Sequence, residues 1–491
     1  MPLILPGNVA SATAATTYDV VNSCRFNDPD TAYMSKTQSG GNRRTYTISF
    51  WFKKGLLSND ENFFHSYSAA RDQLNVKSRG NDDIYIVGYS DSDSTTFDLT
   101  SAGGLFRDPA AWYHLVVAVD TTQGTAANRM KVYINGVQFT NWSGTPSYPA
   151  ENEQTDVNNS GSTFTVGRSE ESTGTAYYDG YIAEFCLIDG SALAPTSFGE
   201  FDEDSPTIWK PIDVSGLTFG TNGFYLDFED SGNLGNDANG GTDFTETNLA
   251  AADQATDTPT NNFATWNPLW RWRMDNDTVY SEGNVKASWS TGSDRGFAFA
   301  TMGVSKGKWY WEVKLPTVGR CFSGVGDAEK VAGFNNGPWD ESGSSGESYS
   351  LTIQHRNGDI QTEGSTETAY SADNSDDDIC MWALDMDNNR LWMGINGTWA
   401  DSGDPTSGAT GTGDITTQIG TQVHLTQSEV MTPCCADPST AGGSVLEANF
   451  GGCPSFAISS GNADANGYGN FEYAPPSGFY ALCTKNLAEF G

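Results

Sequence analysis

The sequence predicts an all-β protein made of two antiparallel jelly-roll β-sandwiches in series. The chain has 491 residues, which is more than one hydrophobic core usually serves. It contains 54 Gly and many aromatic residues, whereas runs of Ala, Leu, Glu and Lys at helical spacing are missing. Each half pairs an aromatic-rich strand with a later strand that ends on Asn-Gly, which is typical of tight β-hairpins. We therefore expect helix to account for less than about 15% of the residues.

The first 20 residues form an extended arm, apolar at first and then rich in Ala and Thr, with no periodicity. Because such a segment cannot bury a face of its own, we expect it to be held by another subunit. No basic residue precedes Arg25, and the apolar run is too short for the core of a signal peptide. Nowhere do eighteen apolar residues occur together, so we expect no membrane insertion. The expectation is a chain made in a cytoplasm and left unprocessed.

Short strands separated by Gly, Asn and Asp predict the first sandwich over residues 21–200. The Asn135-Gly136 pair follows one of these strands and indicates a two-residue hairpin turn. The expected strands are residues 45–52, 83–89, 112–120, 131–135, 163–167 and 180–188.

The order of motifs in this region resembles the laminin-G/concanavalin-A-like lectin superfamily. The matching pieces are Trp112-Tyr113-His114 leading to Asp120, the Tyr133-Ile134-Asn135-Gly136 strand end, Val166-Gly167, and Asp179-Gly180-Tyr181-Ile182-Ala183-Glu184. The resemblance implies the sandwich fold and says little about function. His114 lies inside an alternating strand, so we expect a packed histidine rather than a catalytic one.

Residues 201–266 have a different texture and are expected to be a connector. Residues 223–228 form a closing strand in this interpretation. The following stretch to Asn262 is rich in Gly, Asn, Asp and Thr, which favours a connector over a domain.

The second sandwich is expected over residues 267–455. Its predicted strands are residues 309–313, 321–326, 379–385, 390–395 and 445–451. They carry the motifs Gly-Lys-Trp-Tyr-Trp-Glu, Gly-Val-Gly, an Asp-ended strand, the Asn396-Gly397 hairpin and Asn-Phe-Gly, in an order that resembles the SPRY family. SPRY domains are non-enzymatic recognition modules that bind with loops at one end. The loops 334–348 and 400–428 are longer than those of peptide-binding members, so that specificity does not carry over. A C-terminal tail, residues 456–491, returns to a short apolar strand.

The charge balance excludes one class of partner. Lys and Arg number 26 against 62 Asp and Glu, a formal net charge of −36. A nucleic-acid backbone would be repelled, since binding it requires clustered cations. The acidity fits a soluble surface, although Asp91 with Asp93, or Asp376 to Asp378, could hold calcium. Neither run has the spacing of a known calcium loop, so we expect no cofactor beyond this alternative.

The eight cysteines are too sparse for a disulfide scaffold and are expected to be ordinary buried or loop thiols. Cys434, Cys435 and Cys453, with His424 nearby, contain no Cys-x-x-Cys pair, which disfavours a metal site.

No catalytic motif is apparent. Glucanases with a concanavalin-A-like fold need spaced carboxylates on one strand face. The nearest run here, Glu200-Phe201-Asp202-Glu203-Asp204, has adjacent carboxylates and is followed by Ser205-Pro206, which ends a strand. Only four histidines occur, and there is no Gly-x-Ser-x-Gly motif. We expect a protein that is not an enzyme.

Aromatic residues in loops are the candidate ligand-binding residues. A ring flanked by Asn and Asp suits a sugar, whose C–H face stacks while its hydroxyl groups form hydrogen bonds. The alternative is that each Trp closes the open end of its own sandwich. The candidates are Trp339, Asp340, Trp399, Trp142 and Tyr148.

Nearly the whole chain resembles fibre- or lectin-like structural proteins of marine tailed bacteriophages. The resemblance rests on Leu5 to Ala10, the Asn42-Arg43-Arg44-Thr45 step, residues 257–265 and the Pro-Pro-Ser-Gly-Phe tail. It implies a homo-oligomeric virion protein, assembled in the host cytoplasm beside other virion subunits. A tail fibre, tail tip or other surface appendage that recognises host surface glycans is the expected function. The alternative is a structural or decoration protein of capsid or tail without a host ligand.

Overall fold

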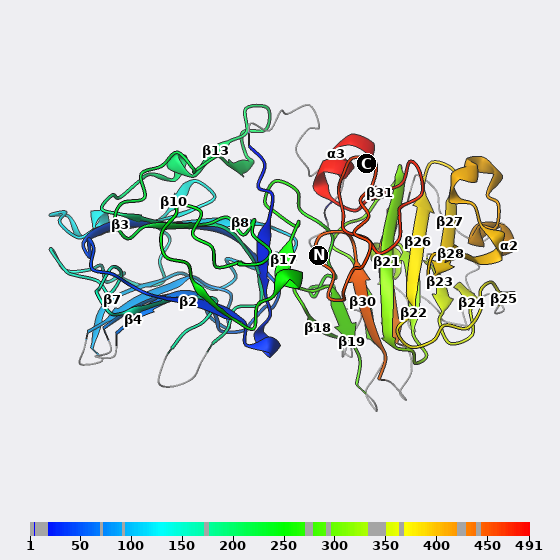
Figure 1. Cartoon of the computed structure of the whole chain (residues 1–491), viewed down its shortest axis with the longest axis horizontal. Coiled ribbons are helices and arrows are strands. Elements are labelled where there is room, and N and C mark those ends of the chain that lie inside the picture. The colour runs from blue at the N-terminus through cyan, green and yellow to red at the C-terminus, as the bar shows by residue number, and fades with distance from the viewer. Residues whose placement is uncertain are drawn as a thin grey trace. The chain divides into compact units, whose positions relative to one another are not determined.

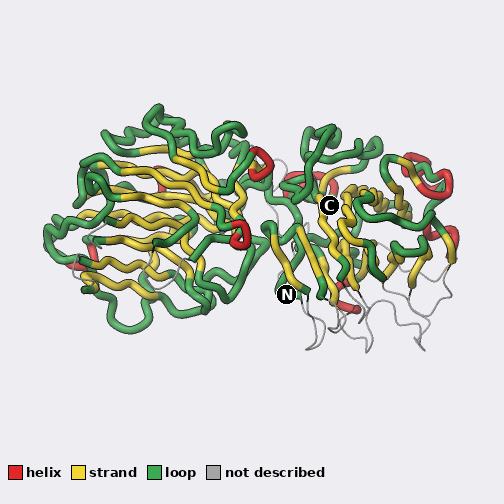
Figure 2. Tube along the Cα trace, turned by 60° about the horizontal axis from the view of Figure 1, so that its bottom comes forward, coloured by secondary structure: helices red, strands yellow, loops and turns green. Residues whose placement is uncertain are grey.

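The computed structural model describes residue 4 and residues 18–68, 72–90, 94–170, 176–270, 278–290, 296–331, 350–362, 368–419, 429–437 and 443–491. Strands account for 40% of the protein and helix for 9%, which confirms the expected all-β class (Figure 2). The chain divides into two compact units. We call Thr13–Thr260 the first unit, and Met1–Ala12 together with Asn261–Gly491 the second unit.

Two large antiparallel sheets form the sandwich of the first unit (Figure 1). The eight-stranded sheet follows the order β10 (Val137–Phe139), β9 (Met130–Ile134), β8 (Tyr113–Asp120), β3 (Thr45–Lys54), β12 (Gly180–Asp189), β1 (Ser23–Phe26) and β17 (Gln254–Ala255), with β15 (Phe224–Leu226) beside β12. The seven-stranded sheet follows the order β16 (Thr245–Thr247), β2 (Tyr33–Thr37), β11 (Thr163–Val166), β4 (Glu61–Tyr67), β5 (Gln73–Ser78), β6 (Tyr85–Tyr89) and β7 (Thr95–Thr100).

Phenylalanine rings from both sheets fill the core of the first unit. Phe50 of β3 stacks on Phe185 of β12 with ring centroids 4.9 Å apart. Phe64 of β4 stacks in the same way on Phe164 of β11, at 5.4 Å. Phe50 and Phe64 then meet edge to face across the two sheets, at 6.2 Å. This arrangement suits aromatic quadrupoles and fills the space between the sheets without polar atoms.

The residues expected to be a connector contribute strands to the first unit. β15, β16 and β17 pair with β12, β2 and β1, and β13 (Gly199–Phe201) pairs with β14 (Trp209–Pro211). The segment with β13 and β14 also covers the outer face of the eight-stranded sheet, where Phe198, Val214 and Phe219 pack on Val116 and Ile188. Both faces of β8 are therefore buried, which explains its continuous apolar sequence.

Both predicted hairpins are present. Asn135 and Gly136 have φ angles of 46° and 77° between β9 and β10. Asn396 and Gly397 have φ angles of 48° and 85° between β27 (Arg390–Ile395) and β28 (Thr398–Trp399). Two successive positive φ angles match the twist of the flanking strands, and Asn-Gly adopts them at low cost.

The second unit is also a two-sheet sandwich. Its eight-stranded sheet follows the order β18 (Val279–Ser281), β19 (Lys286–Ser288), β30 (Val445–Asn449), β21 (Lys308–Thr317), β26 (Ile379–Asp385), β27 and β28, with β31 (Tyr480–Ala481) parallel to β21. The other sheet follows the order β20 (Gly296–Phe299), β29 (Thr432–Asp437), β22 (Phe322–Gly326), β23 (Ser350–Gln354), β24 (Asp359–Thr362) and β25 (Thr368–Ala369). Trp311 and Trp382 stack in the core with centroids 6.1 Å apart.

Helices in the described part of the chain are short. The α-helices are α1 (Ala328–Val331), α2 (Ile415–Ile419) and α3 (Thr484–Phe490). The 3-10 helices span Asp28–Asp30, Ala126–Asn128, Pro195–Ser197, Ala251–Asp253, Ala400–Ser402 and Pro405–Thr410.

The C-terminal tail covers the outer face of the eight-stranded sheet in the second unit. Phe471 meets Tyr310 edge to face at 5.0 Å, and Phe479 packs in the same cluster. Buried Glu312 accepts hydrogen bonds from the backbone N–H groups of Glu472 and Tyr473, at 3.0 and 2.7 Å. Burial raises the pKa of this carboxyl, and the donors from the tail oppose that rise.

At its described residues, Ile4 and 18–20, the N-terminal arm contacts its own chain, and that another subunit holds the arm stays a prediction. Ile4 donates its N–H to the carbonyl of Thr301 at 2.8 Å and accepts from the N–H of Gly303 at 3.1 Å. In the first unit, Val20 packs beside Trp51, and the hydroxyl of Tyr18 donates to Glu184 at 3.1 Å. The backbone groups of Ile4 therefore find hydrogen-bond partners, and Tyr18 and Val20 find packing partners, on the same chain.

Candidate functional site

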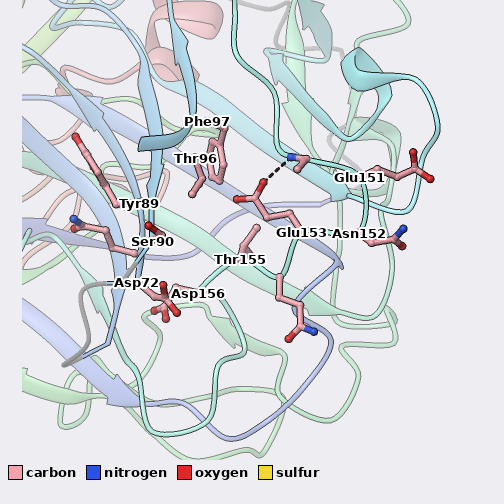
Figure 3. Close-up of a pocket in the computed structure, with 13 residues that line it drawn as sticks. Asp72, Tyr89, Ser90, Thr96, Phe97, Glu151, Asn152, Glu153, Thr155 and Asp156 are labelled. Atoms are coloured by element: carbon pink, nitrogen blue, oxygen red, sulfur yellow. Dashed lines mark hydrogen bonds between the residues drawn. The ribbon is translucent and has the colours of Figure 1, made fainter. Parts of the chain in front are cut away.

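A pocket of about 500 Å³ opens in the first unit beside the ends of β5, β6 and β7 (Figure 3). The three strands supply one side, and the segment after Pro149 supplies the other. The lining residues are Asp72, Gln73, Tyr89, Ser90, Thr96, Phe97, Ala150, Glu151, Asn152, Glu153, Gln154, Thr155 and Asp156.

Strand register brings the first group of lining residues together. Gln73 at the start of β5 lies opposite Tyr89 at the end of β6, and Tyr89 lies opposite Thr95 of β7. A register shift at Gly88 and Tyr89 turns this end of β6. Gly88 lies directly under Phe97, because a Cβ atom there would be 2.1 Å from that ring. Phe97 is 1% exposed and joins the pocket to the phenylalanine core.

His65 fixes the orientation of Gln73. The Nδ1 atom of His65 accepts the backbone N–H of Glu170 at 3.0 Å. The neutral ring therefore carries its proton on Nε2, which lies 2.7 Å from Oε1 of Gln73. Burial lowers the pKa of His65 to about 4 and keeps this tautomer at neutral pH. The amide oxygen of Gln73 is thus occupied, which leaves its NH₂ group as the donor of that side chain.

Three arginines hold the opposite wall. Nε of Arg43 donates to the carbonyl of Thr155 at 2.6 Å, and Nε of Arg44 donates to that of Asn152 at 3.0 Å. Arg129 donates from Nη1 to the carbonyl of Pro149 at 3.1 Å. Charged donors on backbone carbonyls form strong, directional bonds. The wall is therefore formed before any ligand enters.

Carboxylates dominate the polar lining, and they have different roles. Asp156 accepts from Ser66 and Ser162, both at 2.9 Å, and fixes the end of the wall. Burial raises the pKa of Asp156, and these hydrogen bonds oppose the rise. Glu153 accepts the backbone N–H of Ala150 through Oε2 at 2.6 Å. In Figure 3 the Glu153 carboxylate lies on the side of Thr96 and Phe97, whereas Glu151 points away from them.

The pocket combines an apolar floor, a partly exposed tyrosine, amide groups, hydroxyl groups and carboxylates. No Lys, Arg or His belongs to its described lining. Concave sites of this size with a few fixed polar groups bind small ligands or segments of larger ones. Rings beside hydrogen-bonding groups suit a ligand that has C–H faces and hydroxyl groups.

Trp142 and Tyr148, two of the predicted ligand-binding residues, lie just before the wall. Trp142 pairs through its backbone with Ser101, and its ring meets Phe139 edge to face at 4.9 Å. Tyr148 packs on the core of the first unit and directly precedes Pro149. Neither residue lines the pocket, and both are partly buried. Their assignment as ligand-binding residues stays a prediction.

The other three candidates lie in the second part of the chain. Trp399 is partly buried and packs in the cluster that contains Trp392 and Phe479. Trp339 and Asp340 lie outside the described residues.

The two acidic runs considered as calcium sites are the next candidates. Asp91 and Asp93 lie outside the described residues. Asp376 accepts the N–H of Val318, Asp377 pairs with Lys314 at 3.0 Å, and Asp378 accepts from Asn396 and Ser375. In the described ranges, no three His, Cys, Asp or Glu side chains come together so that they could hold a metal ion. All eight cysteines are buried thiols that form no disulfide.

His114 is packed, as expected from its strand position. It is 1% exposed and stacks on Trp51 with centroids 4.6 Å apart.

In the second unit, Ser323 lies 2.8 Å from Nε2 of His355, whose Nδ1 lies 3.2 Å from Asn374. Ser323 and His355 are fully buried, so a substrate cannot reach this chain of polar groups.

The residues that line the pocket were not predicted from the sequence, although two features of the sequence lie close to it. Tyr89 ends a predicted strand and precedes the acidic run Asp91 to Asp93. The segment from Glu151 to Asp156 is a dense run of acids and amides after Pro149. Neither signal reveals that the two segments meet, because the wall is held by Arg43, Arg44 and Arg129 from distant parts of the chain.

Comparison with known proteins supports the fold of this region. Residues 28–196 match the model of the concanavalin A-like lectin/glucanases superfamily. This segment contains every residue that lines the pocket. No curated protein matches the chain.

Three solved structures illustrate its structural likenesses. The SPRY domain of human HERC1 is 16% identical and has a TM-score of 0.28, with 39% of this chain and 99% of that chain covered. A SAP-like pentraxin from Limulus polyphemus is 15% identical and has a TM-score of 0.27, with 36% of this chain and 80% of that chain covered. A Bacteroides ovatus protein described as carbohydrate binding is 14% identical and has a TM-score of 0.31, with 48% of this chain and 60% of that chain covered.

Within the described ranges, no helix has the length and apolarity that crossing a bilayer requires.

Proposed function

We propose that the protein binds glycans without hydrolysing them and that the pocket of the first unit is its binding site. The observation that carries this proposal is a preformed pocket in which Tyr89 and Phe97 stand beside amides, hydroxyl groups and carboxylates. A sugar ring needs this combination, because its C–H face packs on an aromatic ring while its hydroxyl groups form hydrogen bonds. The pocket lies within the segment that matches the lectin and glucanase superfamily model.

The superfamily's name covers both lectins and glucanases, and the arrangement of the acids favours binding. Asp156 is bonded to Ser66 and Ser162, and Glu153 to the N–H of Ala150, so each fixes the wall. Hydrolysis needs one carboxylic acid with a raised pKa and a second carboxylate across the scissile bond. Asp156, whose pKa is raised, is almost fully buried behind its hydrogen-bond donors.

For the biological setting, we propose a bacteriophage virion, in which the chain forms a tail fibre, tail tip or other surface appendage that contacts host glycans. The sequence resemblance to fibre- or lectin-like phage proteins supports this setting. A homo-oligomer beside other virion subunits is part of the proposal, because repeated copies would raise the avidity of a weak sugar site. Labelling purified particles with an antibody against the chain tests the setting.

Glycan binding is tested with the full chain on an array of bacterial surface oligosaccharides. We expect Tyr89→Ala to reduce the affinity for a bound glycan at least tenfold. Tyr177→Ala is the matched control, since Tyr177 is also partly buried in the first unit but packs beside Tyr33 and does not line the pocket. Equal losses in both variants, or no glycan bound by the wild type, would contradict the proposal. In the second case a structural virion protein without a host ligand takes its place.

A further inference from the structure

The charged residues in the described lining of the pocket are all acidic. Asp72, Glu151, Glu153 and Asp156 belong to its lining, while its described lining contains no Lys, Arg or His. The whole chain carries a formal net charge of −36. A ligand that enters this pocket therefore meets negative potential from its walls and from the protein around it.

Two of the four carboxylates are partly neutralised from outside. Asp72 lies 3.8 Å from Arg43, and Glu151 lies 3.6 Å from Arg129. The same arginines donate to backbone carbonyls of the wall, and neither lines the pocket. Both pairs are partly exposed to solvent, so water and salt screen them in part.

Glu153 is different from these two. It has no ion-pair partner among the described residues, and one of its oxygens is held by the N–H of Ala150 at 2.6 Å. Its carboxylate faces Thr96 and Phe97, the strand side of the pocket (Figure 3). A fixed carboxylate beside an apolar floor interacts more strongly with a ligand charge than a mobile one in water does.

Resting on the proposed glycan site, we infer that the pocket selects sugars with a free amino group, such as unacetylated glucosamine units, and rejects sugars that carry a carboxylate. Glu153 is the residue whose carboxylate would accept hydrogen bonds from the ammonium group of the ligand. The NH₂ group of Gln73, whose oxygen is bound by His65, would donate to a hydroxyl group of the same ligand. An anionic sugar would find no cation in the described lining to replace the water that it loses.

The test compares three oligosaccharides of equal length by calorimetry with the full chain. They are a glucosamine oligomer, its N-acetylated form and a galacturonate oligomer. We expect the glucosamine oligomer to bind at least tenfold more tightly than the N-acetylated form, and the galacturonate to bind least. Equal affinities, or tighter binding of the galacturonate, would overturn the inference and leave glycan binding intact. Failure of all three, together with no bound glycan on the array, would overturn the proposed function as well.

Two variants separate the local charge from the overall charge. Glu153→Gln keeps an acceptor for the N–H of Ala150 and should abolish the preference for the amine. Glu203→Gln removes one charge from an exposed position of the same unit outside the pocket, and should leave the preference unchanged. A preference that survives Glu153→Gln, or that both variants lose equally, contradicts the role of Glu153. Binding that disappears in EDTA would assign the carboxylates to a cation and would also overturn the inference.

Discussion

The indole N–H of Trp209 donates to Nδ1 of His114 at 2.9 Å. Because an indole can only donate, the neutral ring of His114 carries its proton on Nε2. Nε2 lies 2.8 Å from the hydroxyl oxygen of Ser49, which therefore accepts this hydrogen bond. A catalytic serine requires the opposite direction, in which the histidine takes the hydroxyl proton. Ser49 and His114 thus form a packing contact and not a nucleophile with its base.

The first prediction concerns the charge of the buried histidines. Burial lowers the pKa of His114 to about 3 and that of His355 to about 4. Both should stay neutral between about pH 5 and 8, and their imidazole ¹⁵N shifts should not change in that range. Since the folded state binds these protons less tightly than the unfolded state, the contribution of the two histidines to the free energy of unfolding should fall as the pH drops below about 6.5. A midpoint near pH 6.5 for either ring would contradict the packing described here.

A second prediction arises at a bulge in β12. Glu184 has a φ angle of 52° beside the register shift between Ala183 and Cys186, and it is 5% exposed. It accepts hydrogen bonds from the hydroxyl groups of Tyr225 and Tyr18, at 2.8 and 3.1 Å. Burial raises the pKa of Glu184 to about 8, and the two tyrosines oppose that rise. The folded state therefore holds the proton more tightly than the unfolded chain does.

The unfolded chain loses the Glu184 proton at lower pH than the folded chain does. We therefore expect the first unit to become less stable as the pH rises from about 4.5 to about 8. One pKa unit corresponds to about 1.4 kcal/mol, so the total reaches a few kcal/mol. The measurement is the unfolding midpoint of the full chain at pH 5, 7 and 9. Glu184→Gln cannot ionise and should lack this part of the pH dependence. Identical profiles for the two proteins would show that Glu184 is already ionised at pH 5.

The third prediction is that Arg43 keeps the pocket in shape. Arg43→Met removes the donors to Thr155 and Gln154 but retains the length of the side chain. We expect faster amide hydrogen exchange in residues 149–156 and about a tenfold loss of glycan affinity, because the wall is no longer preformed. Arg107→Met is the control, since Arg107 is exposed and pairs with Asp82 at 3.5 Å, away from the wall. Unchanged exchange in Arg43→Met would show that the remaining contacts hold the wall without it.

Local patterns predicted a large part of the fold. The predicted strand 112–120 corresponds to β8 (Tyr113–Asp120), and the run from Arg390 to Ile395 is β27. Apolar and aromatic residues fit a buried strand in almost any context. The two Asn-Gly pairs predicted their hairpins because the required φ angles depend on those residues alone.

Other strands depend on distant partners. β16 has the polar sequence Thr-Glu-Thr and forms only because β2, about 200 residues earlier, offers a free edge. β17 pairs with β1 in the same way. The pocket also depends on residues that are distant in the sequence. Strand register makes Gln73 and Tyr89 neighbours, and arginines from elsewhere in the chain hold the wall in place. Composition identified acids and rings in loops but not which of them meet.

The last prediction concerns the acidic run that most resembles a glucanase motif. Glu200 is an exposed residue of β13 and pairs with Lys210 at 3.4 Å. Asp202 accepts the backbone N–H groups of Asp204 and Ser205, at 3.0 and 2.9 Å, and pairs with Lys210 at 3.2 Å. Asp202 thus stabilises a turn. We expect no hydrolysis of β-glucans or alginate-like polymers by the wild type or by either alanine variant.

The two variants should differ in stability. Glu200→Ala removes an exposed ion pair and should change the free energy of unfolding by less than about 1 kcal/mol. Asp202→Ala removes two hydrogen bonds to backbone groups and should cost about 1–3 kcal/mol, because each such bond contributes about 0.5–1.5 kcal/mol. Reducing-sugar assays and urea unfolding measure the two properties separately. Turnover by the wild type that disappears in Glu200→Ala, a variant expected to remain folded, would establish a catalytic role for this run.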